Sequence, residues 1–187
     1  MTGRILVLTA IDEELDKARA PAGVEVIHSG AGKINAASAA TLALLMLRPA
    51  RVINYGTAGR INKTLSGLVE VADVVQRDMM AMPLVPRGRT PYSTNLDRLS
   101  SGFGSVTCGT GDSFVISDDP WLTENNIDIV DMELFAIAHV CQRHSIPWRA
   151  FKFITGDASD FAADHTAEVA EGQDLFWDAV SALKHDT

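Results

Sequence analysis

Three carboxylates of this chain lie directly after predicted strands. Glu14, Glu133 and Asp157 each follow a short run of apolar residues. A carboxylate among buried residues is costly unless it is paired or binds a ligand, whereas an acid at the start of a helix commonly interacts only with the helix dipole. Three such acids at one edge of a sheet therefore favour a ligand-binding or catalytic site.

Small residues form turns near these acids. The segments 30–32 (Gly-Ala-Gly) and 56–59 (Gly-Thr-Ala-Gly) and the residues after Gly109 each follow a predicted strand. Ligands of α/β sheets bind at the carboxyl ends of strands, so we expect these turns to line one crevice. The segment 30–32 either holds an anion at a helix N-terminus or is a close strand-to-helix turn. Phe114 either presents a flat apolar face to a ligand or is an ordinary core residue.

Alternating apolar runs and helical patterns predict the elements that position these residues. Strands are expected at 5–9, 24–28, 51–55, 68–75, 105–109, 127–130 and 148–155. Helices are expected from Asp12, where acids suit a first turn, and at 33–47, 132–144 and 162–183. The helix 33–47 is hydrophobic almost all round, which predicts burial between layers. Residues 56–59 are expected to form a tight turn and 83–101 a surface loop.

The composition restricts the class of protein. The chain has 187 residues, 47% of them hydrophobic, which fits one domain spanning residues 1–187 and excludes an intrinsically disordered chain. The alternation of strands and helices predicts an α/β sandwich around a largely parallel or mixed sheet. The formal net charge of -8 argues against nucleic acid or an anionic membrane as the main partner. A small neutral or cationic ligand, or another protein, is expected instead.

Cysteine and histidine usage points to a reduced compartment without a metal site. Cys108 and Cys141 have no metal-like spacing and are expected to be reduced core thiols of a cytoplasmic protein. The five histidines are scattered, so no metal site is predicted. The apolar run at residues 5–10 is too short for a signal peptide, and no run reaches the roughly 20 apolar residues of a membrane span.

Six segments carry a resemblance when they are taken together and in order. They are residues 10–14, 29–37, 53–59, 110–115, 130–133 with 136–141, and 151–155. In this order they resemble the purine nucleoside phosphorylase superfamily, and within it the methylthioadenosine/S-adenosylhomocysteine nucleosidases. The resemblance implies a three-layer α/β/α sandwich around a central mixed sheet, in shortened form. It also implies a purine nucleoside substrate, no cofactor and a homodimer.

The resemblance implies roles for individual residues. Glu14 would polarise the attacking water, Glu133 would accept hydrogen bonds from the ribose 2′- and 3′-hydroxyls, and Asp157 would give a proton to purine N7. The remaining residues implied to bind substrate are Thr57, Ala58 and Gly59 beside the ribose and base, Phe114 and Val115 at the purine, Met132 under the ribose, and Asp131 and Lys152 within the matching segments.

These roles agree with the chemistry of an N-ribosidic bond. Cleavage builds positive charge on the sugar and negative charge on the departing base. A carboxylate near the sugar stabilises the first charge, and a proton donor at N7 relieves the second. Glycosidases use a similar division of work between two acids.

The sequence departs from the family pattern at two places. The family has Ser/Thr-Asp directly after the last strand, whereas this chain has Thr155-Gly156-Asp157. Without a gap, Gly156 stands where the aspartate belongs; Asp157 reaches the site only if the turn slides by one residue. The segment 15–29 and the stretch after Asp78 are also shorter than usual, which bears on assembly and on closure of the pocket.

Three functions remain open at this point. The favoured one is hydrolysis of an adenine nucleoside such as methylthioadenosine or adenosylhomocysteine. A phosphorylase would need arginines around its phosphate, and the available ones are Arg60, Arg77, Arg87 and Arg89, of which the last three are expected in or near the surface loop. A nucleoside-binding protein with slow or no cleavage would follow if Gly156 replaces the catalytic acid.

Overall fold

The computed structural model describes residues 3–115, 118–159 and 166–183. The strands in these residues are β1 (Ile5–Thr9), β2 (Val24–His28), β3 (Arg51–Arg60), β4 (Gly67–Gln76), β5 (Arg98–Ser100), β6 (Val106–Thr110), β7 (Ile129–Asp131) and β8 (Trp148–Asp157). The helices are α1 (Lys33–Leu47), α2 (Pro120–Glu124), α3 (Leu134–Arg143) and α4 (Thr166–Leu183), with a short 3₁₀ helix at Lys17–Arg19.

The strands form one mixed, eight-stranded sheet that is partly closed on itself. Strand β3 pairs with both β8 and β7, β8 pairs with β4, β4 pairs with β6, and β6 pairs with β7, so five strands complete a ring. Strands β1 and β2 extend the sheet from β3 in parallel, and β5 is added antiparallel to β4. The ring brings the ends of β3, β7 and β8 to one place in the molecule.

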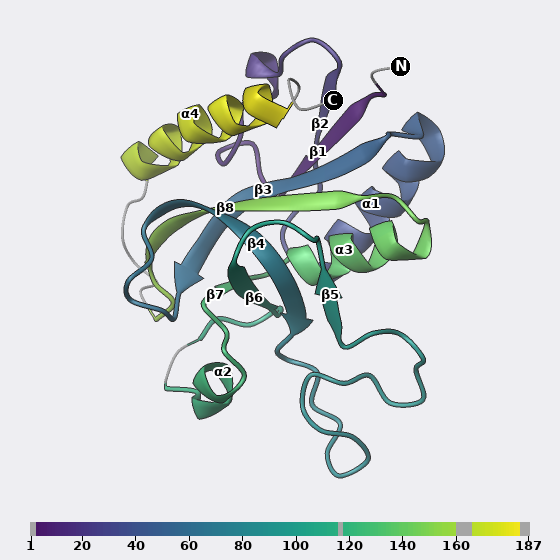
Figure 1. The fold of residues 1–187 in the computed structure, drawn as a ribbon, viewed down its shortest axis with the longest axis vertical. Helices are drawn as coiled ribbons and strands as arrows, with labels where there is room; N and C mark the ends of the chain where they lie inside the picture. Colours follow the sequence, from purple (N-terminus) through teal and green to yellow (C-terminus); the bar gives the residue numbers. More distant parts are fainter. Residues whose placement is uncertain (1–2, 116–117, 160–165, 184–187) are drawn as a thin grey trace.

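Helices cover both faces of this sheet. Figure 1 shows α4 on one side and α1 with α3 on the other. One buried cluster joins α1 and α3 to the sheet, and a second joins α4 to β1, β3 and β8. In the second cluster, the rings of Tyr55 and Phe176 stack with their centroids 4.3 Å apart. The expected three-layer α/β/α sandwich around a mixed sheet is therefore confirmed.

Helix α1 has the predicted bounds but not the predicted burial. Its inner face is built from small side chains such as Ala36 and Ala40, which let the helix lie close to the sheet. Its outer face is open, because Ile34 is 80% exposed and Met46 is 72% exposed in the single chain. The expectation that this helix lies between layers was wrong, since nothing in the described part of the chain packs on that side.

Other boundaries differ for local reasons. Asp12 does not begin a helix: residues 12–14 form a turn, because the Glu14 side chain reaches back to the Thr9 hydroxyl and the Ala10 N–H. Residues 56–59 are not a turn, because they continue β3 and pair with β8. The predicted helix 162–183 is present from Thr166; its first residues lie outside the described part of the chain.

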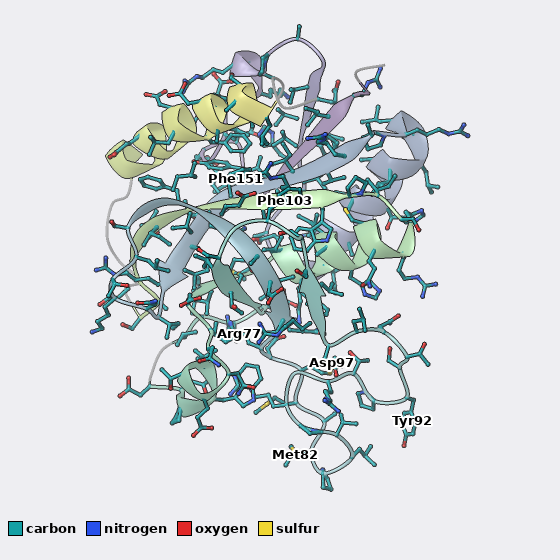
Figure 2. The ribbon with its side chains drawn as sticks, viewed as in Figure 1. Arg77, Met82, Tyr92, Asp97, Phe103 and Phe151 are labelled. Carbon is teal, nitrogen blue, oxygen red and sulfur yellow. The ribbon has the colours of Figure 1, made fainter. Side chains whose placement is uncertain are left out.

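The expected surface loop is largely present. It runs from the end of β4 to β5, which the sequence analysis did not predict, and Figure 2 shows Met82 and Tyr92 on this loop, beyond the sheet. Helix α2 was not predicted either; Pro120 begins it and the Asp119 side chain caps it. Across the described residues, none of the helices is both long and apolar enough to cross a bilayer.

Candidate active site

A cavity of about 310 Å³ opens where β1, β3, β7 and β8 end. Its volume is suitable for a small molecule. Of the residues predicted for the site, its wall contains Glu14, Thr57, Ala58, Gly59, Phe114, Val115, Asp131, Met132, Glu133 and Asp157. Lys152 is the predicted residue that the wall does not contain. Segments far apart in the chain thus meet in one place.

Glu14 is held in a fixed position by hydrogen bonds from two strands. Its Oε1 accepts the Thr57 N–H over 2.8 Å and the Thr57 hydroxyl over 2.7 Å. Its Oε2 accepts the Thr9 hydroxyl and the Ala10 N–H, each over 3.2 Å. The extended backbone of β3 at Thr57, which the sequence analysis expected to be a turn, therefore orients this carboxylate.

Glu133 is the second buried acid of the wall, and it stands just before α3. Its Oε1 accepts the Gly32 N–H at the start of α1 over 2.8 Å. Burial, together with the charge of neighbouring Asp131, raises the pKa of Glu133 to about 7. The side chain can therefore change its ionisation near neutral pH.

The first N–H groups of α1 are both occupied by protein carboxylates. Gly32 donates to Glu133, and the Lys33 N–H donates to Asp112 over 2.7 Å. The Lys33 ammonium in turn contacts Asp78 at 2.6 Å. These contacts favour a strand-to-helix turn at residues 30–32 over an anion-binding loop, the two alternatives that the sequence left open.

Lys152 and Asp131 form an ion pair beneath the cavity. The Lys152 ammonium lies 2.7 Å from Asp131 Oδ2, and each side chain is only 1% exposed. Asp131 also accepts the Thr110 hydroxyl over 2.5 Å and the Leu134 N–H over 2.8 Å. Burial would raise the pKa of Asp131, but the Lys152 charge and these hydrogen bonds hold it below its usual value.

The ammonium of Lys152 also lies close to Glu14. A methyl group added to Gly56 would come within 3.3 Å of both Glu14 carboxylate oxygens and 3.4 Å of Lys152 Nζ. Because Gly56 has no side chain, the Glu14 carboxylate and the Lys152 ammonium can both lie next to it. The Lys152 ammonium thus pairs with Asp131 and lies near Glu14, and its charge acts on Glu133 as well.

Asp157 reaches the cavity through an irregularity in β8. Ile154 pairs with Ala58 and Gly156 pairs with Gly59, so Thr155 is an extra residue in the strand. Such a bulge shifts the following side chains by one position. This bulge lies at the place where the sequence left a one-residue slide open, and both Gly156 and Asp157 line the wall.

The partners of Asp157 are cations. Its Oδ1 accepts a hydrogen bond from Arg60 Nε over 2.7 Å, and its Oδ2 lies 3.8 Å from the Lys63 ammonium. The hydrogen bond from Arg60 is the main cause that lowers the pKa of Asp157. Phe114, on the turn that follows β6, is 67% exposed and also lines the cavity.

Arg77 is a site residue that the sequence analysis misplaced. It was expected near the surface loop, yet it is buried and lines the cavity. Its guanidinium donates to the carbonyl groups of Gly111 and Ser113, and so it supports the turn that carries Phe114. Its position directly after the apolar residues of β4 was the signal that could have revealed this burial.

The other arginines proposed for a phosphate site are engaged with acids. Arg60 pairs with Asp157, Arg87 contacts Asp119 at 2.6 Å, and Arg89 contacts Asp97 at 3.0 Å.

No cluster of potential metal ligands occurs within residues 3–115, 118–159 and 166–183.

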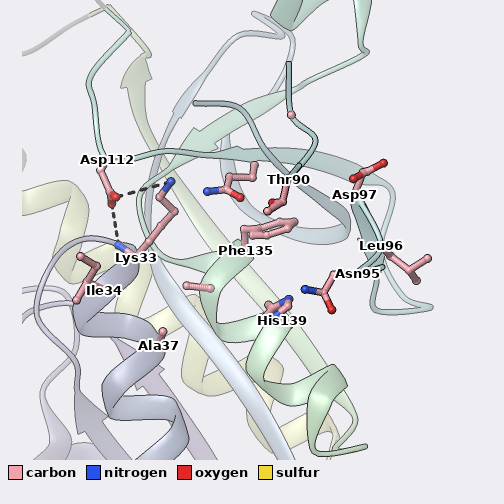
Figure 3. Close-up of a pocket in the computed structure, with 13 residues that line it drawn as sticks. Lys33, Ile34, Ala37, Thr90, Asn95, Leu96, Asp97, Asp112, Phe135 and His139 are labelled. Carbon is pink, nitrogen blue, oxygen red and sulfur yellow. Dashed lines mark hydrogen bonds and ion pairs between the residues drawn. The ribbon is translucent and has the colours of Figure 1, made fainter. Parts of the chain in front are cut away.

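A second cavity, of about 460 Å³, lies outside this site between α1, α3 and the long loop. Figure 3 shows Phe135 and His139 of α3 facing Asn95 and Thr90 of the loop, with Lys33 and Asp112 joined at one end. None of the acids Glu14, Glu133 and Asp157 lines this second cavity.

Comparison with known proteins gives consistent matches. Residues 22–183 match the family model described as the phosphorylase superfamily. The chain is 33% identical to the 5′-methylthioadenosine/S-adenosylhomocysteine nucleosidase of Bacillus velezensis, over 79% of this chain and 76% of that protein. The nucleosidase of Neisseria meningitidis, solved with methylthio-immucillin-A, superposes with a TM-score of 0.78 at 21% identity, covering 96% of this chain and 99% of that one. A mutant nucleosidase of Helicobacter pylori with 5′-methylthioadenosine in its active site gives a TM-score of 0.80 at 20% identity, covering 97% and 100%.

Proposed function

Since this chain belongs to the phosphorylase superfamily and, within it, to the 5′-methylthioadenosine/S-adenosylhomocysteine nucleosidases, we propose that it hydrolyses the N-ribosidic bond of an adenine nucleoside of that type. The products are free adenine and a ribose derivative. The observation that carries the proposal is that Glu14, Glu133, Phe114 and Asp157 line one cavity of a size suited to a small molecule.

Two acids act at the ribose. Glu14 polarises the attacking water, a role that its two hydrogen bonds from Thr57 support because they fix the carboxylate. Glu133 accepts hydrogen bonds from the 2′- and 3′-hydroxyls, and its ionised form is the better acceptor because both oxygens can then accept. Met132 lies under the ribose between these groups, and Thr57, Ala58 and Gly59 border it.

The purine base lies against the remaining residues of the cavity wall. Phe114 stacks on the purine, the Val115 backbone touches its edge, and Asp157 gives a proton to N7. Asp131 lines the cavity and remains a proposed substrate contact, whereas the Lys152 ammonium is buried in its ion pair with Asp131 and acts on Glu133 through its charge. Lys152 is thus a charge partner of the acids and not a ligand of the nucleoside.

Adenine release tests the proposal directly. The purified protein is incubated with methylthioadenosine or adenosylhomocysteine, with and without phosphate, and adenine is measured by chromatography. We expect adenine in both conditions and a strong loss in Asp157→Asn. No adenine at any enzyme concentration would contradict the proposal.

The two alternatives give different results in the same experiment. A phosphorylase would release adenine only when phosphate is present. A phosphate site is disfavoured because the candidate arginines and the first N–H groups of α1 already bind carboxylates of the protein. A nucleoside-binding protein would bind adenosine in calorimetry without turnover, and Asp157→Asn would not change its affinity.

We also propose a homodimer, supported by apolar side chains that the single chain leaves open. These are Ile34, Leu42, Leu45 and Met46 on α1 and Met80, Met82 and Leu84 on the loop. Sedimentation equilibrium should give twice the 20.1 kDa chain mass. Leu45→Lys should weaken the dimer, whereas the matched change Leu175→Lys on α4 should not.

The expected compartment and organisation remain proposals. Cys108 and Cys141 are both buried and free, which supports a reducing, cytoplasmic setting. We likewise propose a single domain over residues 1–187, on the basis of the chain length. The net charge of -8 supports the proposal that neither nucleic acid nor a membrane is the main partner.

A further inference from the structure

Asp157 lies in the wall between two cavities. The smaller one, of about 310 Å³, is the candidate active site, and the larger one, of about 700 Å³, lies beside α2. Val115, Asp157 and Ala158 line both. The Asp157 side chain therefore stands at the boundary of both cavities.

Arg60 fixes the present orientation of that carboxylate. The guanidinium donates from Nε to Asp157 Oδ1 over 2.7 Å and from Nη1 to the Leu65 carbonyl over 3.2 Å. The second contact anchors Arg60 to the backbone, so the arginine is oriented independently of Asp157. Arg60 lines the larger cavity and not the smaller one, so it holds the acid from the side away from the nucleoside.

The charged groups around Asp157 leave Arg60 as the dominant one. Lys63 is farther away, at 3.8 Å, and its side chain is 82% exposed. The larger cavity also contains Asp118 and Asp119. The smaller cavity contains Arg77 together with the carboxylates Glu14, Asp131 and Glu133. Among the described residues that line either cavity, Arg60 is the one that hydrogen-bonds to Asp157.

We propose that Arg60 is a positioning residue that restrains Asp157: while the Arg60 guanidinium holds Oδ1, the carboxyl stays ionised and does not protonate the departing base. The inference rests on the proposed function. Cleavage requires a protonated Asp157, whose proton moves to N7 as the electron pair of the C1′–N9 bond goes to the purine. Water gives its hydroxide to C1′ and its proton to Glu14, so the charges balance. Asp157 is then left as a carboxylate that Arg60 recaptures.

The consequence is a rate that falls as the pH rises. Each unit by which a pKa lies below the working pH reduces the protonated fraction about tenfold. Because the Arg60 hydrogen bond lowers the pKa of Asp157, replacing Arg60 raises the fraction of enzyme that carries the needed proton. Loss of a cation would thus increase turnover at neutral and alkaline pH.

The test compares kcat against pH for the wild type, Arg60→Gln and Arg60→Lys. We expect the alkaline limb of the kcat–pH profile, where kcat falls as the pH rises, to lie at higher pH in Arg60→Gln than in the wild type. Turnover at pH 8 should rise by about threefold to tenfold, because one partly exposed ion pair shifts a pKa by roughly one unit or less. Arg60→Lys keeps the charge and should stay close to the wild type. The matched control Arg98→Gln, whose partner Asp73 lies in neither cavity, should leave the limb in place.

A titration without substrate separates this inference from the proposed function. The Asp157 carboxyl is followed by ¹³C NMR, with Asp157→Asn to assign its signal, and its pKa should rise in Arg60→Gln. An unchanged pKa, or a raised pKa with an unmoved rate limb, overturns the role of Arg60. If no variant releases adenine while the pKa does rise, the proposed hydrolysis is wrong and the catalytic role of the pair falls with it.

Discussion

The acids at the ribose and the acid at the base are held by different kinds of partner. Glu14 and Glu133 are oriented by backbone N–H groups and hydroxyls of strands and of a helix start. Asp157 is oriented by the long cationic side chains of Arg60 and Lys63. Hydrogen bonds from neutral donors and an adjacent cation both favour the ionised form of a carboxylate, but the cation also adds an opposite charge.

The pKa values of Glu133 and Asp157 are displaced in opposite directions. Burial raises the pKa of Glu133, whose ionised form is the better hydrogen-bond acceptor, and Arg60 lowers the pKa of Asp157, which must be protonated to act. At neutral pH each acid is therefore displaced from the state that the reaction uses. Variants at Lys152, Glu14, Asp157 and Glu133 alter one end of the site at a time.

Removing the buried cation under the ribose end should have the largest effect. Lys152→Met leaves Asp131 buried without its partner, which should lower the free energy of unfolding by about 3–5 kcal/mol, measured by urea denaturation. Lys63→Met, at an 82% exposed side chain, should change it by less than about 0.5 kcal/mol. Equal stability of the two variants would show that the ion pair at Lys152 is not needed to hold the carboxylates.

Replacing the acid that handles water should abolish most of the turnover while leaving binding intact. Glu14→Gln keeps the shape of the side chain but removes the negative charge. We expect kcat to fall by about 10²–10⁴-fold, the usual range for a lost acid or base. Adenosine affinity in calorimetry should stay within a fewfold of the wild type. A kcat within threefold of the wild type would remove Glu14 from the reaction.

Replacing the acid at the base should have a smaller effect at neutral pH. Asp157→Asn should lower kcat by about 10²-fold, near the lower end of the range for acid catalysis, because much of Asp157 is already ionised there. The loss should grow as the pH is lowered, since the wild-type acid then becomes protonated. A loss that is the same at every pH would point to a contact of Asp157 with the base and not to proton transfer.

The sequence predicted the strands well, and with them the place where the acids meet. Apolar runs such as residues 5–9 and 148–155 mark buried strands, and the small residues after them mark the edge of the sheet. Convergence of Glu14, Glu133 and Asp157 could be expected from this pattern. The roles of the three acids remain predictions.

What the sequence did not predict depends on tertiary contacts. The extension of β3 through residues 56–59 requires its neighbour β8, and small residues alone read as a turn. The burial of Arg77 depends on carbonyl groups of Gly111 and Ser113, far along the chain. The bulge at Thr155 and the Arg60–Asp157 pair likewise arise only when β3 and β8 lie side by side, so their effect on the acid could not be foreseen.

The smallest and most informative effect is the pH dependence set by Glu133. Because its pKa is about 7 and the ionised carboxylate is the better hydrogen-bond acceptor, the affinity of Asp157→Asn for adenosine, measured by calorimetry, should fall as the pH is lowered through that value. In the unfolded chain the carboxyl ionises at its ordinary, lower pKa, so the folded state retains the proton more strongly between the two values. The free energy of unfolding should therefore decrease as the pH rises through this window.

Glu133→Gln tests both consequences because it cannot ionise. The pH dependence of adenosine affinity should disappear, at a lower overall affinity, and the decrease in stability with rising pH should become smaller. The fall of kcat with rising pH, which we assign to Asp157, should remain. If that fall of kcat vanished together with the pH dependence of binding, the two ends of the site would titrate as a single unit, and the separate control of Glu133 and Asp157 would have to be abandoned.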